Sequence, residues 1–231
     1  MAYPLYLTVR PAPKPEDIPL LRKELEAAFP HEDNLSYLDI LCNASLPRVA
    51  AERLGALALL PSLFREAGMD SRSLILRRNE RGRPYCDTVN GSPTGFDFNL
   101  SHAAAHIAGA LLVGEGKVGV DVEEPIPPKR ALPLIRRYCS EGELALLDGL
   151  PVDENLAARF FTSTWVEREA IAKQEGGGMP LRFDTTDLPI GVTLWSGHLT
   201  HTETAVALCA PVKNAPNRPR LTADSLTVSF P

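Results

Sequence analysis

The sequence predicts an α+β fold made of two similar halves, residues 1–116 and 117–231, and three observations lead to this prediction. Each half shows helical periodicity followed by short runs with strand-like alternation. Residues 108–113 (AGALLV) resemble residues 205–210 (AVALCA), which alone is too short a match to prove duplication. With 231 residues, 44% of them apolar, the chain can build the packed core of one large domain or two small ones.

The first half is expected to begin with a strand over 3–9 and a helix over 15–29, with Pro15 in the first turn of the helix. A helical pattern covers 48–67, where Pro61 should kink or split the helix. The stretch 81–95 is rich in Pro, Gly and Asn and is predicted to be a loop. Strands are predicted at 73–76, 96–100 and 106–113.

The second half repeats this order after a strand over 117–123. Ser140 and Glu143 form a capping box for a helix that ends near Gly149. Asp153 is expected to cap a long helix running to Gln174, which the three glycines 176–178 end. Further strands are predicted at 191–195, 203–210 and 221–230.

Composition narrows the class of protein. A net charge of −5 argues against nonspecific nucleic-acid binding, which needs clustered Lys and Arg. No apolar run approaches the roughly 20 residues of a membrane span, and the N-terminus lacks a secretion signal, so we expect a cytoplasmic protein. The four cysteines lie far apart without zinc-site spacing, and we expect them to be reduced and mostly buried.

Residues 119–123 (GVDVE) predict a strand with two carboxylates on one face. Three valines at 118, 120 and 122 alternate with them and should be buried. Asp121 and Glu123 would have Cα atoms about 6.6 Å apart, two strand rises. The pair could be solvent-facing charges on an edge strand. The prolines that follow favour a domain junction instead, where a cation such as Mg²⁺ would relieve the repulsion.

A second group of ionisable residues lies on the long helix. Phe161, Trp165, Glu169 and Lys173 follow one another at four-residue intervals and share a ridge. Glu169 and Lys173 could be an ordinary surface ion pair, but the two aromatic residues on the same ridge weaken that interpretation. The solvated face is assigned instead to three neighbours, Glu167, Arg168 and Glu175.

Positive charge is concentrated shortly after the carboxylate strand, at Lys129, Arg130, Arg136 and Arg137. Two interpretations stay open for this basic segment, a solvated helix face and a docking patch for an acidic partner.

Four motifs, in this order, resemble those of the 4′-phosphopantetheinyl transferases of the larger, monomeric, surfactin-synthetase-activating type. They are residues 82–84 (GRP), 98–102 (FNLSH), 119–123 (GVDVE) and 165–176 (WVEREAIAKQEG). The resemblance implies transfer of the phosphopantetheine arm of coenzyme A to a serine of an apo acyl or peptidyl carrier protein, which is acidic. It also implies release of adenosine 3′,5′-bisphosphate and a pseudo-twofold pair of halves with the active site in the cleft between them.

The resemblance assigns the reacting groups to the second half. Asp121, Glu123 and Glu169 match the Mg²⁺ carboxylates. Glu169 also matches the base for the incoming serine, directly or through water, and Lys173 matches the lysine that neutralises the pyrophosphate and protonates the leaving group.

The resemblance places the coenzyme mostly in the first half. Ser101 and His102 match residues that contact coenzyme A phosphates, and Arg83 matches a basic position in the nucleotide pocket. An arginine for the 3′-phosphate is expected at Arg48 or Arg53, and the sequence leaves the choice open.

The chain departs from the family pattern in the helix motif, where Arg168 replaces the usual lysine and could change phosphate contacts. Basic residues expected earlier in the chain could be Arg22 or Lys23. Two other functions stay open at this point. They are a Mg²⁺-dependent hydrolase of a nucleotide pyrophosphate and a noncatalytic module that binds the carrier or the coenzyme.

Overall fold

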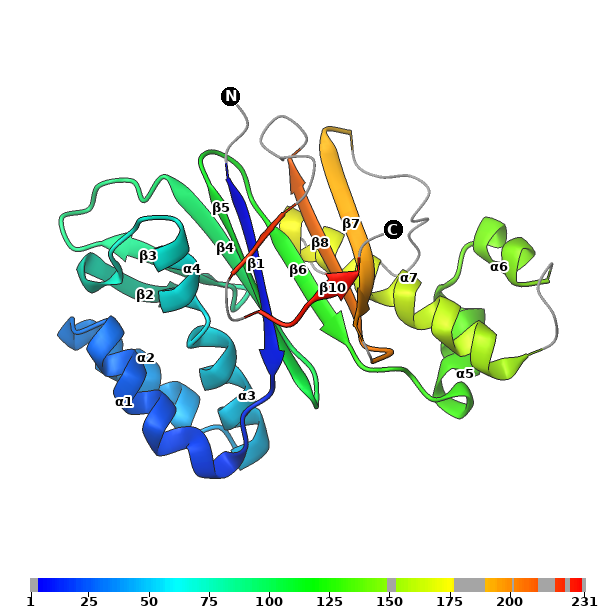
Figure 1. The fold of residues 1–231 in the computed structure, drawn as a ribbon, viewed down its shortest axis with the longest axis horizontal. Helices are drawn as coiled ribbons and strands as arrows, with labels where there is room; N and C mark the ends of the chain where they lie inside the picture. Colours follow the sequence, from blue (N-terminus) through cyan, green and yellow to red (C-terminus); the bar gives the residue numbers. More distant parts are fainter. Residues whose placement is uncertain are drawn as a thin grey trace.

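The computed structural model describes residues 4–148, 153–176, 190–200, 202–211, 219–222 and 225–229. It contains helices together with mainly antiparallel sheets, so the predicted α+β class is confirmed. Two four-stranded sheets lie side by side in the middle of the molecule, and a two-stranded sheet flanks the first of them (Figure 1). In the described part of the chain, no helix has the length and apolar character needed to cross a membrane.

The first sheet has the strand order β4-β5-β1-β9, and helices from the first half of the chain cover it (Figure 1). Its core includes Phe64, which packs edge-on against Phe29 and Phe98 with ring centroids 6.4 and 6.5 Å apart. The elements of this half are β1 (Leu5–Pro11), η1 (Pro15–Asp17), α1 (Ile18–Ala28), α2 (Glu32–Cys42), α3 (Pro47–Leu57), α4 (Leu60–Glu66), η2 (Ser71–Ser73), β2 (Leu74–Arg78), β3 (Pro84–Thr88), β4 (Phe96–His102) and β5 (His106–Val113).

The second sheet has the order β10-β7-β8-β6, and helix α7 lies across β6 and β8 (Figure 1). The approach of helix and strand is very close at Gly119, where an added Cβ would lie 1.9 Å from the carbonyl oxygen of Ala170. Only glycine permits that contact. The elements of this half are β6 (Gly119–Glu123), α5 (Pro128–Tyr138), α6 (Glu141–Asp148), α7 (Glu154–Glu175), β7 (Val192–Leu199), β8 (Ala205–Pro211), β9 (Arg220–Leu221) and β10 (Val228–Ser229).

The two sheets meet along β4 and β6, and polar side chains make the connection. Asp97 and Asn99 accept hydrogen bonds from the backbone N–H groups of Val118 and Val120, at 2.8 and 2.9 Å. Two residues further along β4, the hydroxyl of Ser101 donates to Asp121 at 2.7 Å. Because strand side chains alternate, these three polar residues share one face of β4 and fix the position of β6 against it.

The C-terminal segment returns to the first sheet. Strand β9 pairs in parallel with β1, and the N–H of Leu226 donates to the carbonyl of Val9 at 2.8 Å. Strand β10 then pairs with β7 in the second sheet. The division at residue 117 stays a prediction, and this segment crosses it.

Most predicted elements of the described chain are present. The pattern over 48–67 is split at its proline into α3 and α4, and Asp153 caps α7. The capping box of α6 is present in both directions, with hydrogen bonds of 2.8 and 3.2 Å between Ser140 and Glu143. The four cysteines are free thiols and three of them are buried. Residue 3, Gly149, Gly177 and Gly178 lie outside the described residues.

Three expectations about elements were wrong or incomplete. The predicted loop 81–95 contains strand β3, which pairs with β2 along its whole length, because Tyr85 and Cys86 alternate outward and inward despite the surrounding turn residues. Helix α2 was not predicted. The single strand expected over 221–230 is two short strands in the described residues, each completing a different sheet.

Candidate active site

Strand β6 presents its side chains as the alternation predicts. Val118, Val120 and Val122 are buried in the core between the sheets, whereas Asp121 and Glu123 point to the other face. Asp121 is 5% exposed and Glu123 is partly exposed. The carboxylates therefore lie where β6 passes under α7, close to the end of β4.

Lys173, Asp121 and Ser101 meet at the centre of the candidate site. The ammonium of Lys173 is 2.6 Å from Asp121 Oδ1 and 3.0 Å from Ser101 Oγ. The three residues come from α7, β6 and β4, so this contact joins the long helix to both sheets. The structure thus brings together the predicted Lys173 and Asp121, and Ser101 forms a hydrogen bond with each of them.

The other two carboxylates experience burial and negative charge. Burial, then Asp121 and Glu124, raise the pKa of Glu123 to about 7. Burial also raises the pKa of Glu169. The positive charge of Lys173 opposes this shift, and the negative charge of Asp121 adds to it. Both shifts come first from burial, which disfavours the charged carboxylate, and the negative charge of Asp121 adds to each of them.

The donor set fits Mg²⁺ in its chemistry, because carboxylate oxygens are the ligands that this ion prefers. The geometry is less complete. Among the described residues, no three His, Cys, Asp or Glu side chains are gathered closely enough to hold a metal ion. Lys173 supplies the positive charge next to Asp121 instead.

A cavity of about 530 Å³ opens beside this cluster. Glu169 and Lys173 of α7 line one side, and Asn99 with Leu100 of β4 line another. The turn before β3 closes it with residues 81–84. This cavity is the place where a substrate could reach the Lys173 ammonium.

A smaller cavity of about 210 Å³ lies next to it and shares Gly82, Pro84 and Leu100. His102 and Arg53 line it together with Tyr37 and Arg78, whose guanidinium lies over the Tyr37 ring at 5.3 Å. Two cationic side chains, an aromatic ring and a histidine line this cavity, and side chains of these kinds can contact phosphate groups and flat rings.

The two candidate arginines of α3 have different surroundings. Arg48 is exposed and pairs with Glu52, and Glu52 also lies 3.2 Å from Nδ1 of His102. Arg53 lines the smaller cavity itself. Burial lowers the pKa of His102, Glu52 opposes this shift, and Lys173 and Arg53 reinforce it. The structure therefore brings Arg53, not Arg48, to the cavity that holds His102.

Arg83 lies at the edge of the 530 Å³ cavity, but its guanidinium is directed into the protein. It donates to Asp97 at 2.5 Å, to the carbonyls of Phe98 and Val118 at 3.0 and 2.8 Å, and to the carbonyl of Lys173. Its side chain is 13% exposed.

The expectation that Glu167 and Arg168 face solvent was wrong. Arg168 is 3% exposed and forms an ion pair with Glu143, and Ser196 donates a hydrogen bond to the partly buried Glu167. Only Glu175 of that group is exposed. Four-residue spacing identified the ridge of Lys173 but could not show that Glu143 of α6 and Ser196 of β7 contact the neighbouring residues of α7.

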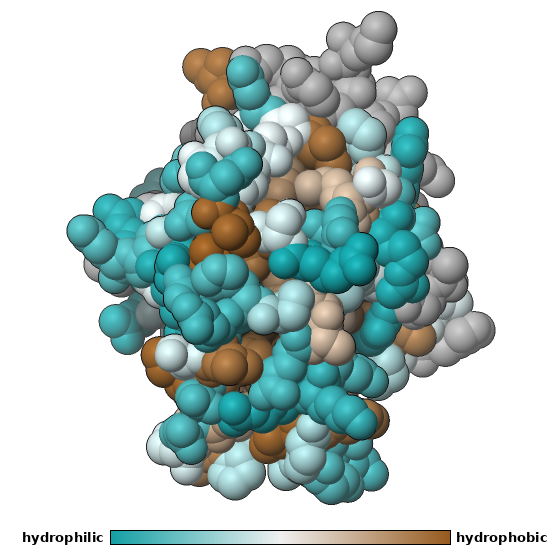
Figure 2. Space-filling view, turned by 90° about the vertical axis from the view of Figure 1, so that its left-hand side faces the viewer, coloured by the Kyte–Doolittle hydropathy of each residue, from teal (hydrophilic) through white to brown (hydrophobic). Residues whose placement is uncertain are grey.

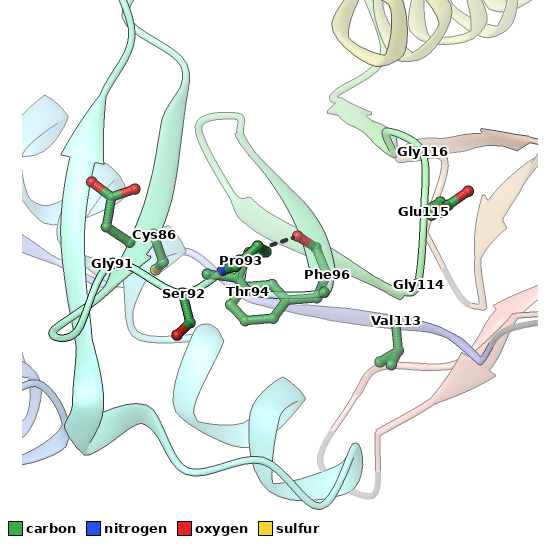
Figure 3. Close-up of a pocket in the computed structure, with 12 residues that line it drawn as sticks. Cys86, Gly91, Ser92, Pro93, Thr94, Phe96, Val113, Gly114, Glu115 and Gly116 are labelled. Atoms are coloured by element: carbon green, nitrogen blue, oxygen red, sulfur yellow. Dashed lines mark hydrogen bonds between the residues drawn. The ribbon is translucent and has the colours of Figure 1, made fainter.

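A larger cavity, of about 740 Å³, lies at the opposite end of β4 (Figure 3). Phe96 lines it from the start of that strand, and the turn 114–116 and the loop 91–95 complete it. Figure 3 shows the hydrogen bond from the Thr94 hydroxyl to the Phe96 carbonyl, and the Glu115 side chain at the edge of the cavity. None of the predicted site residues lines this cavity, so its size does not connect it with the carboxylate cluster.

The face of the molecule that carries α1 and α2 is mainly hydrophilic. Figure 2 shows its hydrophobic residues in small separate groups among charged and polar ones. Exposed hydrophobic side chains of these helices include Leu20 and Ile40.

Comparisons with known proteins agree in pointing to one family. Residues 117–207, which include the carboxylate strand and α7, match the 4′-phosphopantetheinyl transferase superfamily. The chain is 34% identical over 147 aligned residues to the 4′-phosphopantetheinyl transferase AcpT of Escherichia coli O157:H7. The aligned region covers 64% of this chain and 69% of that relative. It is 25% identical over 132 residues to the 4′-phosphopantetheinyl transferase Sfp of Bacillus subtilis (strain 168), covering 57% of this chain and 54% of the relative.

Proposed function

Because this chain belongs to the 4′-phosphopantetheinyl transferase family, we propose that it transfers the phosphopantetheine arm of coenzyme A to a serine of an apo carrier protein. The observation that carries the proposal is the contact of Lys173 with Asp121 and Ser101 beside a cavity of about 530 Å³. That contact supports the proposal because a cation, a carboxylate and a hydroxyl would together face a pyrophosphate that enters the cavity.

In the proposed reaction the serine oxygen of the carrier forms a bond to the β-phosphorus of coenzyme A. The bond from that phosphorus to the bridging oxygen breaks, and adenosine 3′,5′-bisphosphate leaves. Glu169 takes the serine proton directly or through water, and burial, which raises the pKa of Glu169, makes its carboxylate a stronger proton acceptor. Lys173 gives a proton to the leaving phosphate or neutralises its charge.

Asp121, Glu123 and Glu169 would hold Mg²⁺ in this proposal. The ion would supply positive charge to the pyrophosphate, in a site where burial and repulsion already raise the pKa of Glu123 to about 7. Other residues of the protein would position these groups. Ser101 forms hydrogen bonds with both Asp121 and Lys173, and Asn99 accepts a hydrogen bond from the backbone of the strand that carries Asp121 and Glu123.

The nucleotide end of coenzyme A would occupy the smaller cavity. Arg53 offers charge and His102 a ring nitrogen for hydrogen bonds to its phosphates, and the Tyr37–Arg78 stack offers a surface for a flat base. In this proposal the nucleotide would lie on one side of Lys173 and the carrier serine would approach from the other.

An acidic carrier is proposed to dock on α5. Lys129, Arg130, Arg136 and Arg137 are all exposed on this helix, which packs against α7. We also propose that the protein is a monomer and is located in the cytoplasm.

The test is a mass-shift assay. The protein is mixed with coenzyme A, Mg²⁺ and each of several apo carriers from fatty-acid, polyketide and peptide synthesis. We expect at least one carrier to gain the mass of one phosphopantetheine arm, and the same carrier with its acceptor serine replaced by alanine to gain nothing. No gain with any carrier would refute the proposal, and release of free phosphopantetheine without a carrier would support a hydrolase instead.

Two variants connect the assay to the site. Asp121→Asn should lower the transfer rate by at least about 100-fold while the protein stays folded, because it removes the carboxylate that Lys173 contacts. Asp87→Asn, an exposed carboxylate of β3, is the matched control and should transfer normally. Near-normal transfer by Asp121→Asn would show that this carboxylate has no part in the reaction.

A further inference from the structure

The guanidinium of Arg83 contacts three separate segments outside its own turn. It donates to Asp97 and the Phe98 carbonyl in β4, to the Val118 carbonyl immediately before β6, and to the Lys173 carbonyl near the end of α7. A guanidinium has five N–H donors in a fixed planar fork, and such a fork suits several acceptors held at once. Nη2 is directed to Asp97, Phe98 and Val118, and Nη1 is directed to Lys173, so both terminal nitrogens of the guanidinium contact the protein itself.

Two of these acceptors belong to the reacting part of the site. The carbonyl of Lys173 lies in the last turn of α7, where carbonyls have no partner within the helix and a cation is favourable. The ammonium of the same residue reaches Asp121, and Val118 begins the run of residues that carries Asp121. Arg83 thus holds the backbone on both sides of the Lys173–Asp121 contact.

We propose that Arg83 is a positioning residue, which keeps β6 and the end of α7 at the separation where Lys173 meets Asp121. It does so in place of binding a coenzyme A phosphate directly, the role that its position in the family motif suggests. The kinetic part of this proposal rests on the transferase function proposed above.

The cost of releasing Arg83 supports this assignment. If the guanidinium turned toward a phosphate, the carboxylate of Asp97 and two backbone carbonyls would lose their donor inside the protein. Burial already raises the pKa of Asp97, and the charge of Arg83 is the first effect that opposes the shift. A phosphate contact would therefore leave a poorly hydrated carboxylate without its main counter-charge.

The first test is Arg83→Lys, which keeps the positive charge but replaces the planar fork by a single ammonium. We expect kcat for transfer to fall at least about tenfold while Kd for coenzyme A, measured without carrier, changes by less than about threefold. Hydrogen exchange of residues 118–123 and 170–176 should become faster. Arg77→Lys is the matched control, since this β2 arginine pairs with Asp33 and Asp87 at the surface, and it should change neither quantity.

The second test, Asp97→Asn, weakens the contact between Arg83 and Asp97 by changing Asp97. The two roles predict different changes in Kd for coenzyme A. A positioning role predicts lower kcat with an unchanged Kd for coenzyme A. A phosphate-binding role predicts tighter coenzyme binding, because the guanidinium loses its competing carboxylate. This variant also decides the question if Arg83→Lys does not fold.

Weaker coenzyme binding by Arg83→Lys with normal kcat and normal exchange would overturn the proposal, and so would tighter binding by Asp97→Asn. If the unmodified protein transfers to no carrier, the proposed function fails on its own. The coenzyme Kd and the exchange rates would still test the position of Arg83.

Discussion

Arg168 and Glu143 form a buried ion pair that joins α7 to α6, one residue before Glu169. Their side chains are 3% and 2% exposed. Arg168 also donates to the carbonyl of Tyr138 at the end of α5, at 2.7 Å, and Glu143 accepts from the N–H of Ser140 at 2.8 Å. The basic helix, the short helix after it and the helix that carries Glu169 are thus held together at one point.

Replacing Arg168 by Met should destabilise the protein by about 3–5 kcal/mol, because the carboxylate of Glu143 would stay buried without its partner. The measurement is the free energy of unfolding from urea titration. The double variant Arg168→Met with Glu143→Leu should lose less unfolding free energy than Arg168→Met alone, since no buried charge remains unpaired. Arg159→Met, which removes an exposed ion pair with Glu203, is the control, and we expect a loss below about 1 kcal/mol. Equal losses for Arg159→Met and Arg168→Met would contradict this account.

Gly119→Ala should separate β6 from α7. The added Cβ would lie 1.9 Å from the carbonyl oxygen of Ala170 and 2.5 Å from the N of Gln174, and backbone atoms cannot move aside as a side chain can. We expect a loss of about 3 kcal/mol or more in unfolding free energy, together with slower transfer. Gly109→Ala in β5 is the comparison, because its Cβ would meet only side-chain atoms, at 3.2 Å and beyond. A smaller loss for Gly119→Ala than for Gly109→Ala would show that the close approach is not tight.

The choice between the two arginines of α3 can be tested with two forms of the coenzyme. Arg53→Met should raise KM for coenzyme A about tenfold or more and should leave KM for dephospho-coenzyme A nearly unchanged, because Arg53 lines the cavity proposed for the nucleotide. Arg48→Met, whose partner Glu52 lies on the same helix, should have a smaller effect. The assignment is wrong if Arg48→Met alone removes the preference for the 3′-phosphate.

Charge reversal at Arg136 and Arg137 should raise KM for the carrier about tenfold at low salt and leave kcat unchanged, since both side chains are exposed on α5. The difference from the unmodified protein should shrink as ionic strength rises. Reversal at Arg65 and Arg72, exposed residues of the first half, changes the net charge equally and serves as the control. If both pairs of reversals raise KM alike, the effect comes from net charge and not from docking on α5.

The local parts of this structure could be predicted from the sequence. Alternation in residues 118–123 indicated which face of β6 is buried, and four-residue spacing predicted that Phe161 and Trp165 share a ridge, where their ring centroids lie 5.6 Å apart. Caps at Asp153 and Ser140 also followed from local chemistry, because a cap bonds to residues only two or three positions away.

The parts that were missed depend on contacts between distant residues. Strand β3 forms inside a turn-rich stretch because β2 provides its partner, and α2 is fixed by Asn34, whose side chain bonds to the backbone of Leu74 and Leu76. Arg168 belongs to a charged sequence and is buried only because α6 supplies Glu143. Likewise, Arg83 has the composition of a phosphate ligand, and only the fold shows its four acceptors inside the protein.

The return of the C-terminal segment to β1 has a consequence for synthesis on the ribosome. The N–H of Val9 bonds to the hydroxyl of Ser225, a contact that spans 216 positions of the chain. One edge of β1 therefore has no strand beside it until residues 220–226 have been made, so the first sheet completes its pairing only after more than 200 further residues have been added after β1. Such long-range contacts slow folding, and during that interval the open edge of β1 is exposed to pairing with other chains.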